Sequence, residues 1–389
     1  MGEAFIVSAV RTAGGKRDGR VSGWHPVDLA AAVLDAAVDR AGVPAESVDD
    51  VIMGCVSQVG EQGLHFGRNA VLASQLPQSV PAVTIDRQCG SSQQSLHFAA
   101  QAVMSGAQDI VIAAGAEAMS RVAMGSTGRW SVSPQAGSPT SPGLDRAYPR
   151  TIFSQFTGAE MIAQKWDQSR ENLDQFALES HLKAAKATDT GVFDAEILPI
   201  DVDGPDGPEP HSRDEGIRAE ATLEGMGTLR TLTEGGKITA GNASQICDGA
   251  AAVMVASEAA VKAHGLTPLA RIHQMTVTAG DPVIMLEEPL FATDRALQKA
   301  GMSIADIDLY EVNEAFAPVP LAWLAHTGAN PDQLNVNGGA IALGHPLGGS
   351  GAKLMTTLVH ALHARGKRYG LQTMCEGGGI ANVTIVERC

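Results

Sequence analysis

One unit occurs twice along this chain. Residues 40–54 (RAGVPAESVDDVIMG) align with residues 299–313 (KAGMSIADIDLYEVN) at an offset of 259 positions, and both copies read as a helix end, a turn and a strand. The same offset sets the turn CGSSQQSL at 89–96 opposite GGSGAKLM at 348–355, and an apolar stripe at helical spacing follows each turn. The repeat predicts two similar α/β halves built from β-α-β units.

The offset is larger than one such half, so we expect an insertion at 119–245. This stretch is rich in Gly, Pro, Ser and Arg, with polar loops predicted at 125–147 and 201–215 and one helix near 171–188. Long excursions of this kind usually cover or line a binding site, and a purely structural cover is the alternative. The predicted domains are an N-terminal half (1–118 plus 246–269), a loop domain for substrate and coenzyme (119–245) and a C-terminal half (270–389).

Composition narrows the possible partners. The net charge of −15 and the pI near 5.1 disfavour binding to nucleic acid, although one phosphorylated cofactor could still dock on a local basic patch. Hydrophobic residues make up 44% of the chain and the mean hydropathy is +0.01, which predicts a folded protein. No apolar run approaches the length that a membrane span needs.

Five cysteines, at positions 55, 89, 247, 375 and 389, form no CxxC pair and no zinc-finger spacing. We therefore expect no structural metal. The run from Met1 to Val10 reads as a first strand rather than a signal peptide. An odd number of cysteines without an export signal predicts a reducing, cytoplasmic location.

Cys89 lies in VTIDRQCGSSQQS, where a β-rich run ends in a glycine-bearing turn and an amphipathic helix begins. A helix N-terminus presents unpaired N–H groups and a positive dipole end, so we expect a lowered thiol pKa and a donor for an oxyanion. A small buried packing residue is the alternative.

Three further candidates lie in the C-terminal half. His345 occurs in the glycine-dense stretch NVNGGAIALGHPLGGSG, where it could accept a thiol proton, or it could be only structural beside Pro346. Cys375 precedes the turn EGGG, in which the backbone N–H of Gly377 could face a reacting carbonyl. Asn313, in EVNEAF, ends a strand where an amide could hold a water molecule or a carbonyl group.

The segments QCGSSQQS, NEAF, GGAIALGHPLGGSG and CEGGG, in this order, resemble the four active-site blocks of the thiolase family. The resemblance implies that Cys89 is acylated by a 3-ketoacyl thioester, that His345 activates it, and that Cys375 exchanges the α-proton of acetyl-CoA. It also implies one oxyanion hole from His345 and a water held by Asn313, and a second from the backbone N–H groups of Cys89 and Gly377.

The family resemblance further implies an α/β thiolase fold, with two pseudo-symmetric βαβαβαββ halves in a five-layered αβαβα arrangement and an inserted loop domain. It implies a homodimer or homotetramer, with coenzyme A as a substrate and no permanently bound cofactor. ITAGNAS at 238–244 resembles the pantetheine-binding segment, so Ser244 is a candidate coenzyme A contact, and Arg218 is a candidate near the adenine nucleotide.

One departure concerns the substrate. Thiolases that act on acetoacetyl-CoA typically carry Met-Gly-x-Thr-Ala-Glu, whereas this chain reads QFTGAE from Gln155 to Glu160. Loss of that methionine predicts a longer or bulkier acyl group, and the motif wording is similar to actinobacterial thiolases of steroid degradation. We expect a 3-ketoacyl-CoA thiolase of fatty acid or steroid degradation. The alternatives are a biosynthetic acetyl-CoA C-acetyltransferase, a decarboxylating ketoacyl synthase, against which Cys375 argues, and a non-enzymatic relative.

Overall fold

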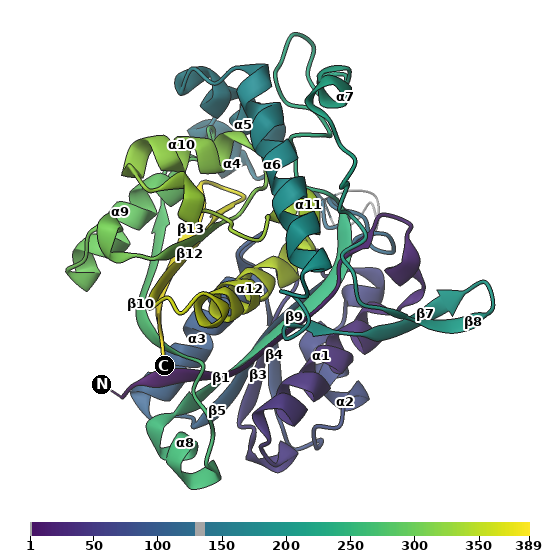
Figure 1. The fold of residues 1–389 in the computed structure, drawn as a ribbon, viewed down its shortest axis with the longest axis vertical. Helices are drawn as coiled ribbons and strands as arrows, with labels where there is room; N and C mark the ends of the chain where they lie inside the picture. The colour runs from purple at the N-terminus through teal and green to yellow at the C-terminus, as the bar shows by residue number, and fades with distance from the viewer. Residues whose placement is uncertain (1, 129–136) are drawn as a thin grey trace.

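The computed structural model describes residues 2–128 and 137–389, and its centre is a mixed sheet that runs through the whole molecule (Figure 1). The strand order is β11-β12-β13-β10-β1-β9-β5-β3-β4, with β2 beside β9 and β6 beside β1. The described strands of this sheet are β1 (Ala4–Thr12), β2 (Gly15–Lys16), β3 (Asp50–Gly54), β4 (Ala82–Ile85), β5 (Ile110–Ala118), β6 (Ile197–Leu198), β9 (Cys247–Ser257), β10 (Ala270–Ala279), β11 (Leu309–Val312), β12 (Tyr369–Glu376) and β13 (Ile380–Arg388).

Helices pack on both faces of this sheet and form layers with it. Helices α3 and α12 lie side by side in the middle, α1 and α2 cover the N-terminal strands from outside, and α9 and α10 cover the C-terminal strands (Figure 1). This arrangement confirms the predicted five layers. The described helices are α1 (Pro26–Ala41), α2 (Phe66–Ala73), α3 (Ser91–Ser105), α4 (Pro142–Ala147), α5 (Gln155–Lys165), α6 (Arg170–Asp189), α7 (Leu223–Gly227), α8 (Glu258–His264), α9 (Glu288–Ala300), α10 (Pro318–Thr327), α11 (Ala340–Leu343) and α12 (Ser350–Ala364).

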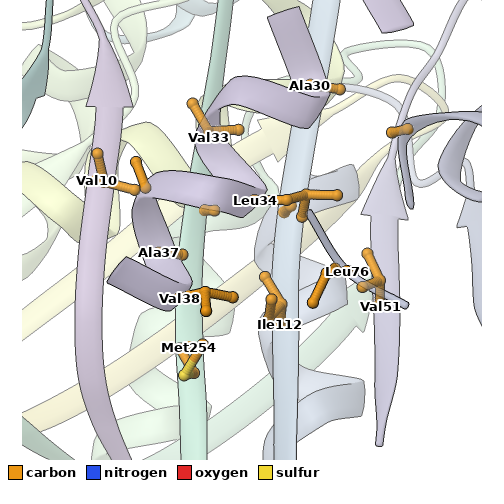
Figure 2. Packing of buried hydrophobic residues seen from close by; sticks show 14 of the residues in the cluster. Val10, Ala30, Val33, Leu34, Ala37, Val38, Val51, Leu76, Ile112 and Met254 are labelled. Atoms are coloured by element: carbon orange, nitrogen blue, oxygen red, sulfur yellow. The ribbon is translucent and has the colours of Figure 1, made fainter. Parts of the chain in front are cut away.

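The outer layer of the N-terminal half forms because α1 carries an apolar stripe. Val33, Leu34 and Val38 point from α1 toward Ile112 on β5 and Met254 on β9 (Figure 2). Burying one such side chain contributes about 1.5–3 kcal/mol. Truncation of Leu34 to Ala is therefore expected to cost about 2–5 kcal/mol.

The internal repeat extends to backbone details. Helices α1 and α9 both end at a glycine in the left-handed region, Gly42 with φ 71° and Gly301 with φ 65°, a conformation that glycine adopts without steric cost. After each cap, an aspartate just before one strand binds the start of the parallel strand beside it in the sheet. Asp49 Oδ2 accepts two backbone N–H groups at the start of β5, at 2.6 and 3.0 Å, and Asp308 Oδ2 accepts two at the start of β12, at 3.0 and 2.9 Å.

The two halves differ at one strand. In the N-terminal half, β4 pairs with β3 in parallel. The corresponding part of the C-terminal half has only an isolated bridge between Tyr310 and Leu334. Strand β1 lies in the middle of the sheet, between β9 and β10, and its pairing with β10 makes the two halves one continuous sheet.

The inserted stretch is more ordered than predicted. The predicted helix near 171–188 is confirmed as α6, but the expected polar loop at 201–215 is wrong, because β7 (Ile200–Gly204) and β8 (Gly207–His211) form an antiparallel hairpin there. The predicted loop at 125–147 contains the short helix α4, and its residues 129–136 lie outside the described residues. In the described ranges, every helix is too short or too polar to cross a membrane.

Candidate active site

Cys89 lies in the turn between β4 and α3, one residue before the helix N-cap Gly90. It is nearly buried, in a small apolar cluster with Met119, Leu347 and Met374. Burial, and after it the nearby carboxyl group of Glu376, raise the pKa of the Cys89 thiol to about 12. The prediction of a lowered pKa is therefore wrong for the free enzyme, since loss of hydration outweighs the helix N-terminus, and the thiol needs a base.

Cys375 lies near the end of β12 and is fully buried. Burial raises its pKa well above the usual value, and the next contribution comes from Cys89, so the two thiols are close enough for the charge of one to oppose that of the other. The turn after Cys375 packs against the turn of Cys89, because a Cβ atom on Gly377 would lie 2.9 Å from Gln88 Oε1. Two cysteines far apart in sequence thus belong to one site.

His345 is held by two hydrogen bonds, one at its backbone and one at its ring. Its backbone N–H donates to the Gln245 carbonyl oxygen at 3.0 Å, and its Nδ1 lies 2.5 Å from Ser350 Oγ. Among the described residues, Nε2 has no hydrogen-bond partner although it is buried. Burial lowers the pKa of His345 to about 4, and the positive charge of Lys353 lowers it as well. The imidazole is therefore neutral at physiological pH and can accept a proton at Nε2.

Asn313 follows β11 at the same end of the sheet as Cys375. Its backbone N–H donates to the Thr373 carbonyl oxygen at 3.0 Å on β12. The side chain is buried, yet neither Oδ1 nor Nδ2 has a partner within the described part of the chain. Buried amides normally form hydrogen bonds, so this pair of free groups indicates a place for a ligand or a water molecule.

Glu117 attaches the loop of His345 to the N-terminal half. It lies near the end of β5, and its carboxylate accepts the backbone N–H groups of Val56, Ser57 and Gly348 at 2.9 Å each and the Gln62 amide at 2.7 Å. Because Gly348 belongs to the C-terminal half, this one anion bridges the two halves beside the site.

A buried group of charges lies behind His345. Asp214, from the inserted stretch, binds Arg11 on β1 at 2.9 and 3.0 Å and lies 3.4 Å from Lys353 Nζ on α12. Lys353 Nζ also donates to the Leu343 carbonyl oxygen at 2.5 Å, and Asp214 accepts the Gly14 N–H at 2.8 Å. These charges thereby join the start of the chain, the inserted stretch and α12, and Lys353 fixes the backbone at Leu343, two residues before His345.

A cavity of about 640 Å³ opens beside His345, between the inserted stretch and the body of the molecule. Ser244 and Arg218, the two predicted coenzyme A contacts, line it, as does Gln155 from the substrate motif. Cys89 packs in one apolar cluster with two of the lining residues, Met119 and Leu347. The other lining residues are Lys16, Arg17, Met124, Phe156, Glu215, Gly216, Leu232, Ala240, Ala243, Gln245, Ile246 and Phe316.

Sequence analysis missed four polar residues of the site: Ser350, Lys353, Glu117 and Glu376. The repeat carried a signal for three of them, because the offset of 259 positions relates Glu117 to Glu376 and Ser91 to Ser350. No such signal marked Lys353, whose role depends on which groups its side chain contacts after folding. Across the described ranges, no group of three or more His, Cys, Asp or Glu side chains is arranged to hold a metal ion.

Family models match almost the whole chain. The model described as "Thiolase, N-terminal domain" covers residues 4–259, and "Thiolase, C-terminal domain" covers residues 266–388. The chain belongs to the thiolase family. As a thiolase, it is an acyltransferase, and coenzyme A is a substrate of this family.

Known thiolases resemble this one along their full length. Steroid 3-ketoacyl-CoA thiolase FadA6 of Mycobacterium tuberculosis is 50% identical over 392 residues, covering 100% of this chain and 95% of the relative. The 3-ketoacyl-CoA thiolase of Bacillus subtilis is 40% identical, with 100% of both chains covered. The crystal structure of human mitochondrial 3-ketoacyl-CoA thiolase superposes with a TM-score of 0.88 at 37% identity, covering 100% of this chain and 99% of that one.

Proposed function

We propose that this thiolase cleaves 3-ketoacyl-CoA with coenzyme A, giving acetyl-CoA and a shortened acyl-CoA, in the degradation of fatty acids or steroids. The observation that carries the proposal is a pair of buried thiols, Cys89 and Cys375, so close that ionisation of one disfavours ionisation of the other. The same site contains His345, which is neutral and has a free Nε2 among the described residues. Acyl transfer with carbon–carbon cleavage needs both a nucleophile and a separate acid for the departing carbon, and two thiols supply them.

In the proposed first step, His345 Nε2 takes the proton of Cys89, and the thiolate attacks the 3-keto carbon. The bond between C2 and C3 then breaks, leaving an acyl thioester on Cys89 and the enolate of acetyl-CoA. Cys375 gives its thiol proton to C2 of that enolate. The backbone N–H groups of Cys89 and Gly377, together with His345 and a water held by Asn313, stabilise the oxyanions.

In the second step, the thiol of coenzyme A attacks the acyl group on Cys89. Its proton passes to the Cys375 thiolate, and Cys89 leaves as a thiolate that recovers a proton from His345. Exchange between two thioesters is nearly isoenergetic, so a cysteine nucleophile keeps the acyl group activated. Lys16, Arg17 and Arg218 line the cavity and can attract the phosphates of coenzyme A, and Ser244 lies where it can contact the pantetheine.

Two observations support a substrate larger than acetoacetyl-CoA. Two relatives are named for such substrates: FadA6 is a steroid 3-ketoacyl-CoA thiolase, and the Bacillus subtilis enzyme is a 3-ketoacyl-CoA thiolase. Gln155, which replaces the methionine typical of thiolases that act on acetoacetyl-CoA, lines the cavity. The apolar side chains of Met119, Met124 and Phe156 line the same cavity. A wide, partly apolar cavity favours bulky acyl groups.

The testing experiment compares thiolysis of acetoacetyl-CoA, a medium-chain 3-ketoacyl-CoA and a bulky cyclic 3-ketoacyl-CoA. We expect kcat/KM to favour the two larger substrates, and mass spectrometry to find the acyl group on Cys89. Cys89→Ala should abolish both turnover and labelling. Labelling at another cysteine would overturn the nucleophile assignment, and a preference for acetoacetyl-CoA would overturn the substrate.

Biosynthetic condensation of two acetyl-CoA molecules is the second candidate. It is favoured by the acetyl-CoA acetyltransferase of Escherichia coli, which is 41% identical over 399 residues with 100% of both chains covered. Under that alternative, the acetoacetyl-CoA arm of the comparison gives the highest kcat/KM.

We also infer that the chain forms homodimers through β4, the free edge of the sheet in the N-terminal half. Val83 on this strand is 42% exposed, and Leu64, which precedes a histidine bonded to β4, is 93% exposed. An exposed edge strand with apolar side chains is a template for pairing with a second copy. Light scattering should give the mass of a dimer or of a dimer of dimers, and Val83→Lys should shift it toward the monomer.

The division into two halves and a loop domain at 119–245 is part of this proposal. Strand β9, which follows the inserted stretch, pairs with β5, which precedes it, so the N-terminal half closes around its own insertion. All five cysteines are free, which suits a reducing compartment such as the cytoplasm.

A further inference from the structure

Glu376 is a buried carboxyl group with no assigned role. It is the last residue of β12, directly after Cys375, and its exposed fraction is 0%. Neither Oε1 nor Oε2 has a hydrogen-bond partner among the described residues. A charged carboxylate in such a place lacks both hydration and donors, which makes its ionised form costly.

The carboxyl group touches the turn of the nucleophile. A Cβ atom at Gly90 would overlap Glu376 Oε1, so the carboxyl group lies directly against the residue that follows Cys89. Met374 shares this face of β12 and belongs to the apolar cluster of Cys89. A negative charge on Glu376 therefore acts on the Cys89 thiol through a buried, low-dielectric environment.

The repeat supplies an internal comparison. Glu117 is the counterpart of Glu376 in the N-terminal half, and it faces Gly348, the counterpart of Cys89. Glu117 receives three backbone N–H groups and one side-chain amide. At equivalent positions, one carboxyl group is thus surrounded by donors and the other is not.

The surroundings of Glu376 offer acceptors instead. Gln372, Met374 and Glu376 lie on one face of β12, and Asn382 on β13 is the cross-strand partner of Met374. Both have a buried side-chain oxygen without a partner in the described part of the chain. Oxygens without a donor among the described residues therefore lie on the same face of β12 and β13 as Glu376.

We propose that Glu376 is a protonation gate for Cys89: the neutral carboxyl group permits the thiolate to form, and the ionised carboxylate opposes it. In this proposal Glu376 does not touch the substrate, and its charge changes only how readily the Cys89 thiol ionises. The inference rests on Cys89 as the nucleophile of the proposed function.

Burial raises the pKa of Glu376 to about 8, which sets the pH at which the gate operates. The positive charge of Arg87 and the approach of the backbone N–H of Asn382 favour the charged form, but burial outweighs both. The other ionisable groups acting on this pair are Cys375, Asp86 and Glu117, while His97 on α3 is neutral because burial lowers its pKa to about 3. The rate at which Cys89 reacts should therefore rise less steeply with pH near pH 8 than it does below it.

The test is alkylation of Cys89 by iodoacetamide between pH 6 and 10, measured by peptide mass spectrometry on the full chain. Glu376→Gln should react at the same rate as wild type near pH 6 and about tenfold faster at the alkaline end, where only wild type carries the opposing charge. Glu311→Gln is the matched control, because Glu311 is also a buried carboxyl group of raised pKa and its charged neighbours include no cysteine.

A ratio that does not change with pH, or an equal rise in Glu311→Gln, would overturn the gate. If Glu376→Gln does not fold, the wild-type profile decides. The logarithm of its rate should bend downward near pH 8 instead of following a single line of unit slope, and a straight line would overturn the proposal. The assay needs no acyl-CoA, so its failure is distinguishable from failure of Cys89 to become acylated.

Discussion

His345 Nδ1 lies 2.5 Å from Ser350 Oγ, and that hydroxyl group donates in turn to the Pro346 carbonyl oxygen at 3.1 Å. Since the serine proton is directed to Pro346, the serine oxygen is free to accept the N–H at Nδ1. This arrangement assigns the imidazole proton to Nδ1 and leaves the lone pair on Nε2 for catalysis.

The first prediction follows from that contact. Ser350→Ala should release the imidazole from its tautomer and orientation, lowering kcat about tenfold to a hundredfold with little change in KM. Steady-state thiolysis measures both constants, and Ser350→Thr, which keeps the hydroxyl group, is the control. A change confined to KM would contradict a role in orienting the base.

The second prediction concerns Lys353, whose charge helps to lower the pKa of His345. Lys353→Met should raise that pKa, so that His345 becomes protonated and inactive at a higher pH. The acid limb of kcat/KM should move up by about one pH unit. Lys353→Arg keeps the charge and should leave the limb in place. An unshifted limb in Lys353→Met, with the fold intact, would show that burial alone keeps His345 neutral.

The third prediction separates the two thiols. Cys375→Ser should still allow acylation of Cys89 while slowing deuterium exchange into the methyl group of acetyl-CoA by about 10²–10⁴-fold, because a serine hydroxyl is a much weaker acid. Mass spectrometry follows the acyl group and NMR follows the exchange. Exchange at the wild-type rate would remove the acid/base role from Cys375.

The fourth prediction tests the wall of the acyl cavity. Gln155 lines it, and its Nε2 lies 3.5 Å from Met124 Sδ. Gln155→Met should fill part of the cavity and shift the ratio of kcat/KM values toward acetoacetyl-CoA by about tenfold. Gln155→Asn, a shorter side chain, should not produce this shift. An unchanged ratio in Gln155→Met would place acyl selection elsewhere in the cavity.

Much of the fold follows from the repeat. Helices α3 and α12 begin at Ser91 and Ser350 and end at Ser105 and Ala364, so both ends keep the offset of 259 positions that the sequence shows. Local patterns sufficed here, because an apolar stripe and a glycine turn specify a helix and its start wherever they occur.

The parts that failed depend on tertiary contacts. The segment from Ile200 to His211 is polar enough to be read as a loop, yet Ile200 and Val202 insert into the core beside α1 and make it a hairpin. The predicted direction of the Cys89 pKa is wrong because the sequence indicates the helix start, and hence its dipole, but does not show how deeply the thiol is buried. The free oxygens of Glu376 likewise become visible only when the neighbouring strands are in place.

The central position of β1 has a consequence for biosynthesis. Its partners β9 and β10 begin at Cys247 and Ala270, far downstream of Ala4–Thr12. A ribosome adding about 5–20 residues per second needs roughly 12–50 s to make the intervening chain. During that time the first strand, AFIVSAVRT, is an apolar segment outside the exit tunnel, and the only described partner made before β9 is the two-residue strand β6. We expect the nascent chain to depend on a chaperone that covers its N-terminus until the middle of the sheet exists.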